Sequence, residues 1–276
     1  MNKALSIALK LLGLNRAKPK TKYGKMVRRS EHAVTALAMV YILLQFFPQV
    51  VFPHTVQAHD VKLYSSDPIA GDAERLLAEV KSRVGASTLY RPEDRFTVFL
   101  CNSRRLYTFF APFSRGGFAV TIPTSRHIFI ANADIGRNQS RRFGSGYNTR
   151  SLVSVVAHEA GHVLIRRRFG FWKEWMLPTW LKEGYCEVLA RESSFPEKEG
   201  DYLLAHGEDD ASGSFTYFAY RRMVEYLMEE KGKTIEELIC ITLDEQKVRI
   251  EIRDWIHTKA IKQPAEELQS ESALSD

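Results

Sequence analysis

Cysteine is scarce in this chain. Among 276 residues there are three cysteines, Cys101, Cys186 and Cys240. An odd number allows at most one disulfide within the chain. Free cysteines are among the most buried residue types, so we expect all three to act as ordinary packing residues. A folded part of about 220 residues can bury a substantial core without cross-links.

A general excess of basic charge is also missing. The formal net charge is +6 and the pI is about 9.1, values that would suggest nucleic acid as a partner. Residues 1–32, however, hold nine Lys and Arg against one acid, or +8, so the rest of the chain carries −2. Binding of single-stranded nucleic acid would need a basic face with interleaved aromatic residues, and the sequence shows no such face. We therefore expect no nucleic-acid partner.

Long uncharged stretches are rare, and one of them stands out. Residues 33–53 carry no charge and are long enough to cross a bilayer as one helix. Residues 4–14 are also apolar, but Lys10 interrupts them and they are too short to span, so at best they form an interfacial helix. The basic residues before the uncharged segment predict a cytoplasmic tail and export of everything after Pro53. A membrane-anchored protein with its folded part on the periplasmic side is the favoured interpretation.

Two other interpretations of this segment remain open. Val56-Gln57-Ala58 is an acceptable small-residue cleavage site, so residues 33–53 also fit a signal peptide, with a secreted or periplasmic product cleaved after Ala58. The basic tail is long for a signal peptide. The third interpretation is a buried core helix in a cytoplasmic protein.

The clearest chemical motif is the pattern H-E-x-x-H at residues 158–162. Apolar residues at helical spacing from 151 to 165 predict that it lies on a helix. His158 and His162 are four positions apart and share one face, where both imidazoles can bind one metal ion. Glu159, rotated by about 100°, then lies beside the open position of the metal and can polarise a bound water. A surface helix whose side chains face water is the alternative, because the motif also arises by chance.

The residues after the motif supply a third ligand by resemblance. The segment Pro178–Tyr185 resembles the P-x-W-x-x-E-G segment of the gluzincin metallopeptidases. In that superfamily a glutamate on a second helix completes the zinc site, and the resemblance implies that Glu183 takes this part and that the cofactor is Zn²⁺. A catalytic zinc needs three protein ligands and one open position. A solvated helix face is the alternative for Glu183.

The same resemblance assigns two further roles. Glu187 lies one helical turn after Glu183, on the same face. Thermolysin-type gluzincins carry an acid at this spacing, more often aspartate, which accepts the outer N–H of a zinc-bound histidine and fixes its ring. In gluzincins a tyrosine or histidine of the helical lobe often stabilises the oxyanion. Tyr217 is the expected residue and Tyr220 the second candidate, while packing in an amphipathic core is the alternative for both.

The resemblance extends more weakly over residues 60–260 and implies an α+β, zincin-like fold. A small mixed-sheet lobe, with a strand that runs directly into the zinc helix, precedes a mostly helical lobe. Asn148 or Thr149 is the predicted N-cap of that helix. In the family, a strand such as 126–132 lies at the edge of the cleft and pairs with the substrate, although an ordinary internal strand fits equally well. Runs rich in β-branched and aromatic residues predict strands at 95–101, 117–122 and 126–132.

These features divide the chain into four predicted parts. They are a basic cytoplasmic tail at 1–32, a transmembrane or signal-anchor segment at 33–53, a metallopeptidase domain at 54–262 and a polar, disordered tail at 263–276. The segment at 33–53 would attach the chain to the membrane.

The predicted activity is zinc-dependent hydrolysis of peptide bonds in a peptide or protein substrate, with Glu159 as the base. The alternative is a membrane-anchored binding or assembly factor with a structural or catalytically silent zinc site. Glu159 argues against that alternative, because a structural site needs no base. A peptide deformylase is excluded because the chain has no E-G-C-L segment. An intramembrane protease is disfavoured by Arg166–Arg168, which directly follow the motif helix.

Overall fold

The computed structural model describes residues 21–69, 71–144 and 149–258. The chain divides into two compact units, residues 1–51 and residues 52–276. The predicted polar tail at 263–276 lies outside the described residues, as does most of the predicted basic tail.

The first unit contains α2 (Lys22–Phe46) and a short 3-10 helix, η1 (Pro48–Val51). The Thr21 hydroxyl caps α2 by accepting a hydrogen bond from the backbone N–H of Gly24 at 3.0 Å. The helix ends just before Pro48, since the residue preceding a proline disfavours helical geometry. None of its side chains is buried. Among the described residues, no helix has both the length and the apolar character that a membrane span requires.

The second unit begins with a five-stranded mixed sheet in the order β1-β2-β3-β5-β4. The pairs β1–β2 and β4–β5 are antiparallel, whereas β2–β3 and β3–β5 are parallel. Two helices connect the parallel strands, α3 (Ala73–Gly85) and α4 (Arg104–Phe110). The predicted mixed sheet is thus present, with strands β1 (His54–Ala58), β2 (Val61–Ser65), β3 (Phe96–Leu100), β4 (Ala119–Thr121) and β5 (His127–Ile130).

The edge of this sheet distinguishes the two interpretations of the strand at 126–132, and the internal one is correct. The predicted strand at 126–132 corresponds to β5, which pairs with β3 on one side and with β4 on the other. The terminal strand is β4, from the predicted segment 117–122.

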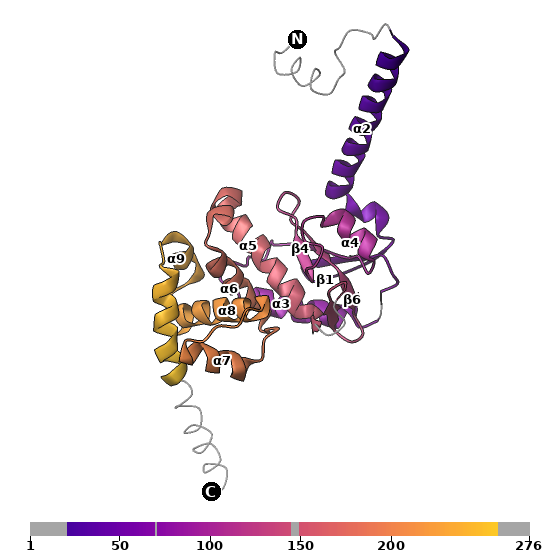
Figure 1. Cartoon of the computed structure of the whole chain (residues 1–276). Coiled ribbons are helices and arrows are strands. Elements are labelled where there is room, and N and C mark those ends of the chain that lie inside the picture. The colour runs from indigo at the N-terminus through magenta and orange to yellow at the C-terminus, as the bar shows by residue number, and fades with distance from the viewer. Residues whose placement is uncertain (1–20, 70, 145–148, 259–276) are drawn as a thin grey trace. The chain divides into compact units, whose positions relative to one another are not determined.

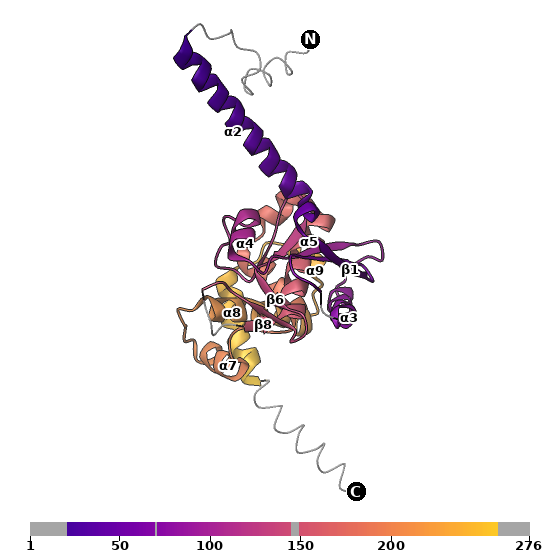
Figure 2. The ribbon, with the colours of Figure 1, turned by 90° about the vertical axis from the view of Figure 1, so that its right-hand side faces the viewer.

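A second, three-stranded antiparallel sheet leads into the motif helix. It consists of β6 (Asn132–Asp134), β7 (Gln139–Arg141) and β8 (Thr149–Ser151), and β6 and β8 are labelled in Figure 2. The next residue after β8 begins α5 (Leu152–Met176), so a strand does run directly into this helix. The N-cap is Ser151, whose Oγ accepts from the Ser154 N–H at 3.3 Å. Thr149 is not the cap because it pairs with Arg141, and Asn148 lies outside the described residues.

A helical lobe follows the sheets. Figure 1 shows α5 between the strands on one side and the later helices, coloured orange and yellow, on the other. Within this lobe α6 makes most of its contacts with α5 and α8. A final helix runs from residue 245 to the end of the described residues at 258. The others are α6 (Thr179–Ala190), α7 (Glu197–His206), α8 (Gly213–Glu229) and α9 (Ile235–Cys240).

Two glycines set how closely these helices pack. A Cβ built on Gly161 of α5 would lie 2.8 Å from the sulfur of Cys186 on α6. A Cβ on Gly184 of α6 would lie 2.3 Å from the carbonyl oxygen of Tyr220 on α8. Larger residues would force the helices apart. Both glycines lie close in sequence to the predicted metal ligands, so the spacing of the site depends on them.

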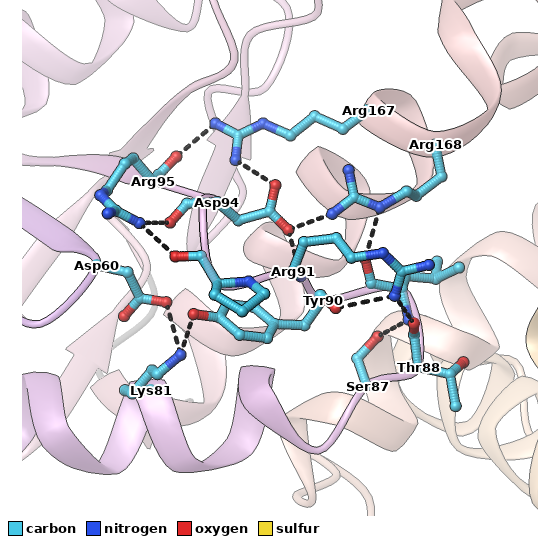
Figure 3. Close-up of polar contacts among 12 residues, drawn as sticks. Asp60, Lys81, Ser87, Thr88, Tyr90, Arg91, Asp94, Arg95, Arg167 and Arg168 are labelled. Carbon is cyan, nitrogen blue, oxygen red and sulfur yellow. Dashed lines mark hydrogen bonds and ion pairs between the residues drawn. The ribbon is translucent and has the colours of Figure 1, made fainter.

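The far end of α5 is bent and fixed by a polar network. Gly170 has φ 80° and ψ 169°, a conformation that interrupts the helix and that glycine adopts readily. Just before it, Arg167 and Arg168 bind the buried carboxylate of Asp94, with Arg167 Nη1 at 2.9 Å from Oδ1. Figure 3 shows both guanidinium groups reaching from α5 to the loop that contains Asp94. The network ties the end of α5 to the segment before β3.

Candidate metal centre

Three predicted ligands meet where α5 packs against α6. Oε2 of Glu183 lies 3.3 Å from Nε2 of His158 and 3.4 Å from Nε2 of His162. The two imidazole centroids are 5.2 Å apart. One carboxylate oxygen therefore faces both ring nitrogens, as ligands of a single ion would.

The spacing of these atoms fits zinc. Ligand atoms about 2.0–2.1 Å from a tetrahedral zinc lie about 3.3 Å from one another. The two Glu183 distances match this separation. All three side chains are largely buried, and they combine two imidazoles with one carboxylate, a donor set found at catalytic zinc sites. His158, His162 and Glu183 thus fit a zinc ion with an open fourth position.

Cys186 competes geometrically for the third position. Ligand atoms of His158, His162 and Cys186 all lie within 4.8 Å of one another. The sulfur, however, sits against the backbone of Gly161, and burial raises the pKa of the thiol well above its usual value. A thiolate is the form that binds metal. Glu183, with one oxygen near both imidazoles, is the better third ligand.

Glu187 lies behind His158, as the resemblance implies. Its Oε1 is 3.0 Å from Nδ1 of His158, although the angle is poor for a hydrogen bond. Burial alone would raise the pKa of Glu187, but contacts with His158 and Arg150 outweigh it and lower the pKa to about 2. For His158 without metal, burial lowers the pKa, yet its contacts with Glu183 and Glu187 raise it to about 10.

Arg150 is a partner that the sequence did not reveal. Its Nη1 and Nη2 donate to the two carboxylate oxygens of Glu187 at 2.8 and 2.9 Å, and Nη2 also donates to the Glu192 carbonyl at 2.9 Å. Arg150 belongs to β8, directly before the motif helix, and both partners are buried. A buried two-point ion pair of this kind fixes the carboxylate in one orientation. Glu187 is thereby held toward His158.

Glu159 is positioned from the sheet. Its Oε2 accepts a hydrogen bond of 2.6 Å from the Thr121 hydroxyl on the edge strand β4. The Thr121 hydroxyl also lies 3.1 Å from the Glu159 carbonyl oxygen. The sequence places Thr121 in a predicted strand but gives no sign of this contact. It holds the carboxylate next to the histidines.

Two neighbouring hollows open beside these residues. His158, Glu159 and Tyr217 line both of them. One, of about 330 Å³, extends toward Arg142, Arg150 and the segment before β4. The other, of about 250 Å³, extends past His162 and Glu183 toward Arg166, Glu174 and Lys182. The site is therefore accessible from two directions.

Tyr217 lies within this arrangement. Its ring centroid is 6.3 Å from that of His158, and it is the fifth residue of α8. Although the residue is partly exposed, partial burial and then the nearby carboxylates, Glu183 first, raise the pKa of its phenol. The ring centroid of Tyr220 lies 6.3 Å from that of Tyr217, and the two rings are tilted by 47°. Arg249 lies over the Tyr220 ring, and Tyr220 is not among the residues that line the two hollows. Of the two tyrosines, Tyr217 faces the site.

No model of a known protein family matches the sequence, and no curated protein matches it either.

Proposed function

We propose that the protein is a zinc-dependent metallopeptidase of the gluzincin type. The observation that carries the proposal is the position of one Glu183 oxygen 3.3 and 3.4 Å from the Nε2 atoms of His158 and His162. Glu159 borders the same hollows. A ligand set with an adjacent carboxylate supports hydrolysis, since a structural zinc site is closed by four ligands.

Different residues of the site have different roles in the proposed hydrolysis. Zinc held by His158, His162 and Glu183 would supply a Lewis acid that acidifies water and polarises the scissile carbonyl. Glu159 accepts the proton of the attacking water and delivers it to the nitrogen of the leaving amine. Thr121 keeps the carboxylate of Glu159 in place through its hydrogen bond. Tyr217, whose phenol is protonated at neutral pH as that of an ordinary tyrosine is, donates a hydrogen bond to the developing oxyanion.

The terminal strand β4 offers a place for an extended substrate. Phe118 and Ile122, which flank β4, bond toward β5: Ala131 N–H, directly after β5, donates to Phe118 O, and Ile122 N–H donates to His127 O. Bonding alternates along an antiparallel strand, so the backbone groups of Ala119 and Thr121 point away from β5. A peptide pairing with them would pass beside Glu159, which Thr121 contacts.

The localisation that we propose is a membrane anchor with the peptidase domain on the periplasmic side. Residues 33–46 lie on α2, whose apolar side chains are exposed. Cleavage after Ala58 is less compatible with the fold. It would remove β1, which pairs along its whole length with β2, and Phe52, which is buried against Phe99 and Phe110. Loss of a buried phenylalanine typically costs about 3–5 kcal/mol.

A binding or assembly factor with a silent zinc site is the second candidate. The contact between Thr121 and Glu159 argues against it, because it orients a base that such a protein would not need. The two hollows beside the ligands argue against it as well, because they leave room for a substrate.

The test combines metal analysis with a cleavage assay on the full chain in detergent. We expect one zinc per chain and cleavage of an unfolded protein substrate. Glu159→Gln keeps the size of the side chain but cannot accept a proton, so turnover should fall by about 10²-fold or more while zinc is retained. Full activity of this variant would exclude the mechanism. Normal zinc content with no cleavage of any peptide would favour the binding factor.

A further inference from the structure

A cluster of exposed apolar side chains lies directly after the bend at Gly170. It consists of Phe171, Trp172, Trp175 and Met176, which are 42%, 68%, 68% and 67% exposed. The Trp172 centroid is 5.1 Å from that of Phe171 and 6.2 Å from that of Trp175. Positions i, i+1, i+4 and i+5 share one face of a helix, so the four residues form a continuous patch. We call it the aromatic patch.

The segment that carries the aromatic patch is held in place from its other side. Glu174 is buried and pairs with Arg166 and, at 3.9 Å, with Lys182. Leu177 is buried immediately after the patch. Before the bend, Asp94 holds Arg167 and Arg168, as Figure 3 shows. The fold thus fixes this segment with its aromatic face outward, where exposure of large apolar side chains usually marks an interaction site.

Charged residues near the aromatic patch indicate which kind of partner it binds. Residues 166–182 contain five cations, Arg166, Arg167, Arg168, Lys173 and Lys182, and one acid, Glu174. Even with Asp94 included, two acids face five cations, and both acids are buried whereas the five cations are partly exposed. Four of these cations are ion-paired with the two acids, yet the group as a whole carries a net charge of +3, which complements anionic headgroups.

We propose that the aromatic patch inserts into the interfacial layer of an anionic lipid bilayer. Tryptophan is suited to this layer because its ring is apolar and its indole N–H remains hydrogen-bonded at the headgroup level. Interfacial segments combine such residues with neighbouring cations and reach about 5–10 Å into the headgroup boundary. This contact belongs to the peptidase domain itself and is separate from the anchor proposed for α2.

The position of the patch bears on the substrate. Arg166, Glu174 and Lys182, which support the patch segment, also line the smaller hollow beside His162 and Glu183. A bilayer on the patch therefore brings this opening close to the headgroups. If the protein is a peptidase as proposed above, its substrates are chain segments that emerge from the membrane surface. The membrane contact itself does not depend on peptidase activity.

The tryptophans allow a direct test with the full chain. All four are in the second unit, and Trp180 and Trp255 are only 2% and 7% exposed. The protein is reconstituted into anionic vesicles whose acyl chains are brominated near the headgroups. Because bromine quenches an indole that it contacts, the emission of Trp172 and Trp175 should fall if the patch reaches the headgroup boundary. The same protein in unbrominated vesicles is the reference.

Two variants show whether the quenching comes from the patch. Trp172→Ala with Trp175→Ala leaves only the buried tryptophans, so the difference between brominated and unbrominated vesicles should vanish. Tyr202→Ala removes another exposed aromatic residue, on α7, and should keep the wild-type quenching. Near-ultraviolet circular dichroism shows that each variant is folded.

Two results would overturn the proposal. The first is equal emission in both kinds of vesicle while the protein floats with the lipid. The second is a blue shift that grows with protein concentration in lipid-free detergent, which would mean that a second copy of the chain covers the patch.

Discussion

Arg150 and Glu187 form a buried two-point ion pair, with each guanidinium nitrogen on one carboxylate oxygen at 2.8 and 2.9 Å. The same carboxylate lies 3.0 Å from Nδ1 of His158, whose Nε2 faces Glu183. A chain of contacts therefore runs from β8 through α6 to the predicted metal ligands. Arg150, which lies outside the predicted ligand set, therefore holds the carboxylate that faces His158.

Breaking the ion pair should affect both stability and zinc affinity. Arg150→Met keeps the length of the side chain but leaves Glu187 as a buried carboxylate without its arginine, at a cost of about 3–5 kcal/mol. Chemical denaturation measures this loss, and zinc titration should show affinity weakened by roughly 10–100-fold. Arg141→Met, at an exposed position on β7, is the matched control. Equal stability of the two variants would contradict the role of Arg150.

Substitutions at Glu183 and Cys186 decide which of them is the third ligand, and a substitution at His162 is the reference for loss of a ligand. His162→Ala should abolish tight zinc binding, because two ligands do not hold a catalytic zinc. Glu183→Gln should do the same, whereas Cys186→Ala should still bind one zinc per chain. Elemental analysis of the purified proteins gives the answer. Zinc retained by Glu183→Gln and lost from Cys186→Ala would reverse the assignment.

Removing the Thr121 hydroxyl should slow catalysis without affecting the metal. Thr121→Val preserves shape and strand propensity but takes away the hydrogen bond to Glu159. A hydrogen bond to a charged group contributes about 1.5–3 kcal/mol, so kcat should fall by roughly 10–100-fold. Thr97→Val on β3, two positions away in the sheet order, serves as the control. Unchanged kcat for Thr121→Val would mean that Glu159 is oriented by other groups.

The metal-free protein should lose stability as the pH rises above neutral. The pKa of His158 is about 10 in the folded state against 6.5 for a free histidine, so the folded state binds the extra proton. The resulting stabilisation is complete below about pH 6.5 and disappears as the pH rises through 10. Thermal unfolding in the presence of a chelator should show this decline, and His158→Gln should flatten it. A chelated wild type whose stability is constant from pH 6.5 to 10 would contradict the shift.

The proposed topology has its own test in bacterial cells. Alkaline phosphatase fused after Pro53 should be active, because the enzyme needs an exported, oxidising location. A cytoplasmic reporter at the same point should be inactive. The opposite pattern, at equal expression, would exclude export. Sequencing of the mature N-terminus should also show that the chain begins before Phe52, because the sheet and its core require residues 52–58.

Local sequence patterns predicted many of the helices and strands correctly. The strands at 95–101 and 117–122 appear as β3 and β4, and the helix around H-E-x-x-H appears as α5, because period and composition depend on neighbouring residues. Pairing between distant segments was not visible in the same way. Thr149 was a predicted N-cap, yet it belongs to β8, because β8 pairs with residues 139–141 and Thr149 itself lies opposite Arg141.

The candidate site shows the same division. The positions of the two histidines and Glu159 follow from helical spacing, whereas Glu183 and Glu187 came from a resemblance. Thr121 lies 38 residues from Glu159 in sequence, and Arg150 lies 37 residues from Glu187. Such contacts depend on the packing of β4 and α6 against α5. The sequence around a single threonine or arginine does not indicate which distant residue it will contact.

Phe52 has a mechanical consequence for the protein. It lies six residues after the end of α2 and is buried against Phe99, Phe110 and Phe129, directly before β1. Tension applied through the N-terminal segment reaches the domain first at this side chain and then at β1, the outermost strand at its end of the sheet. The Phe52 contacts and the β1–β2 pairing are therefore the first to bear a load, before it reaches the helices that hold His158 and Glu183.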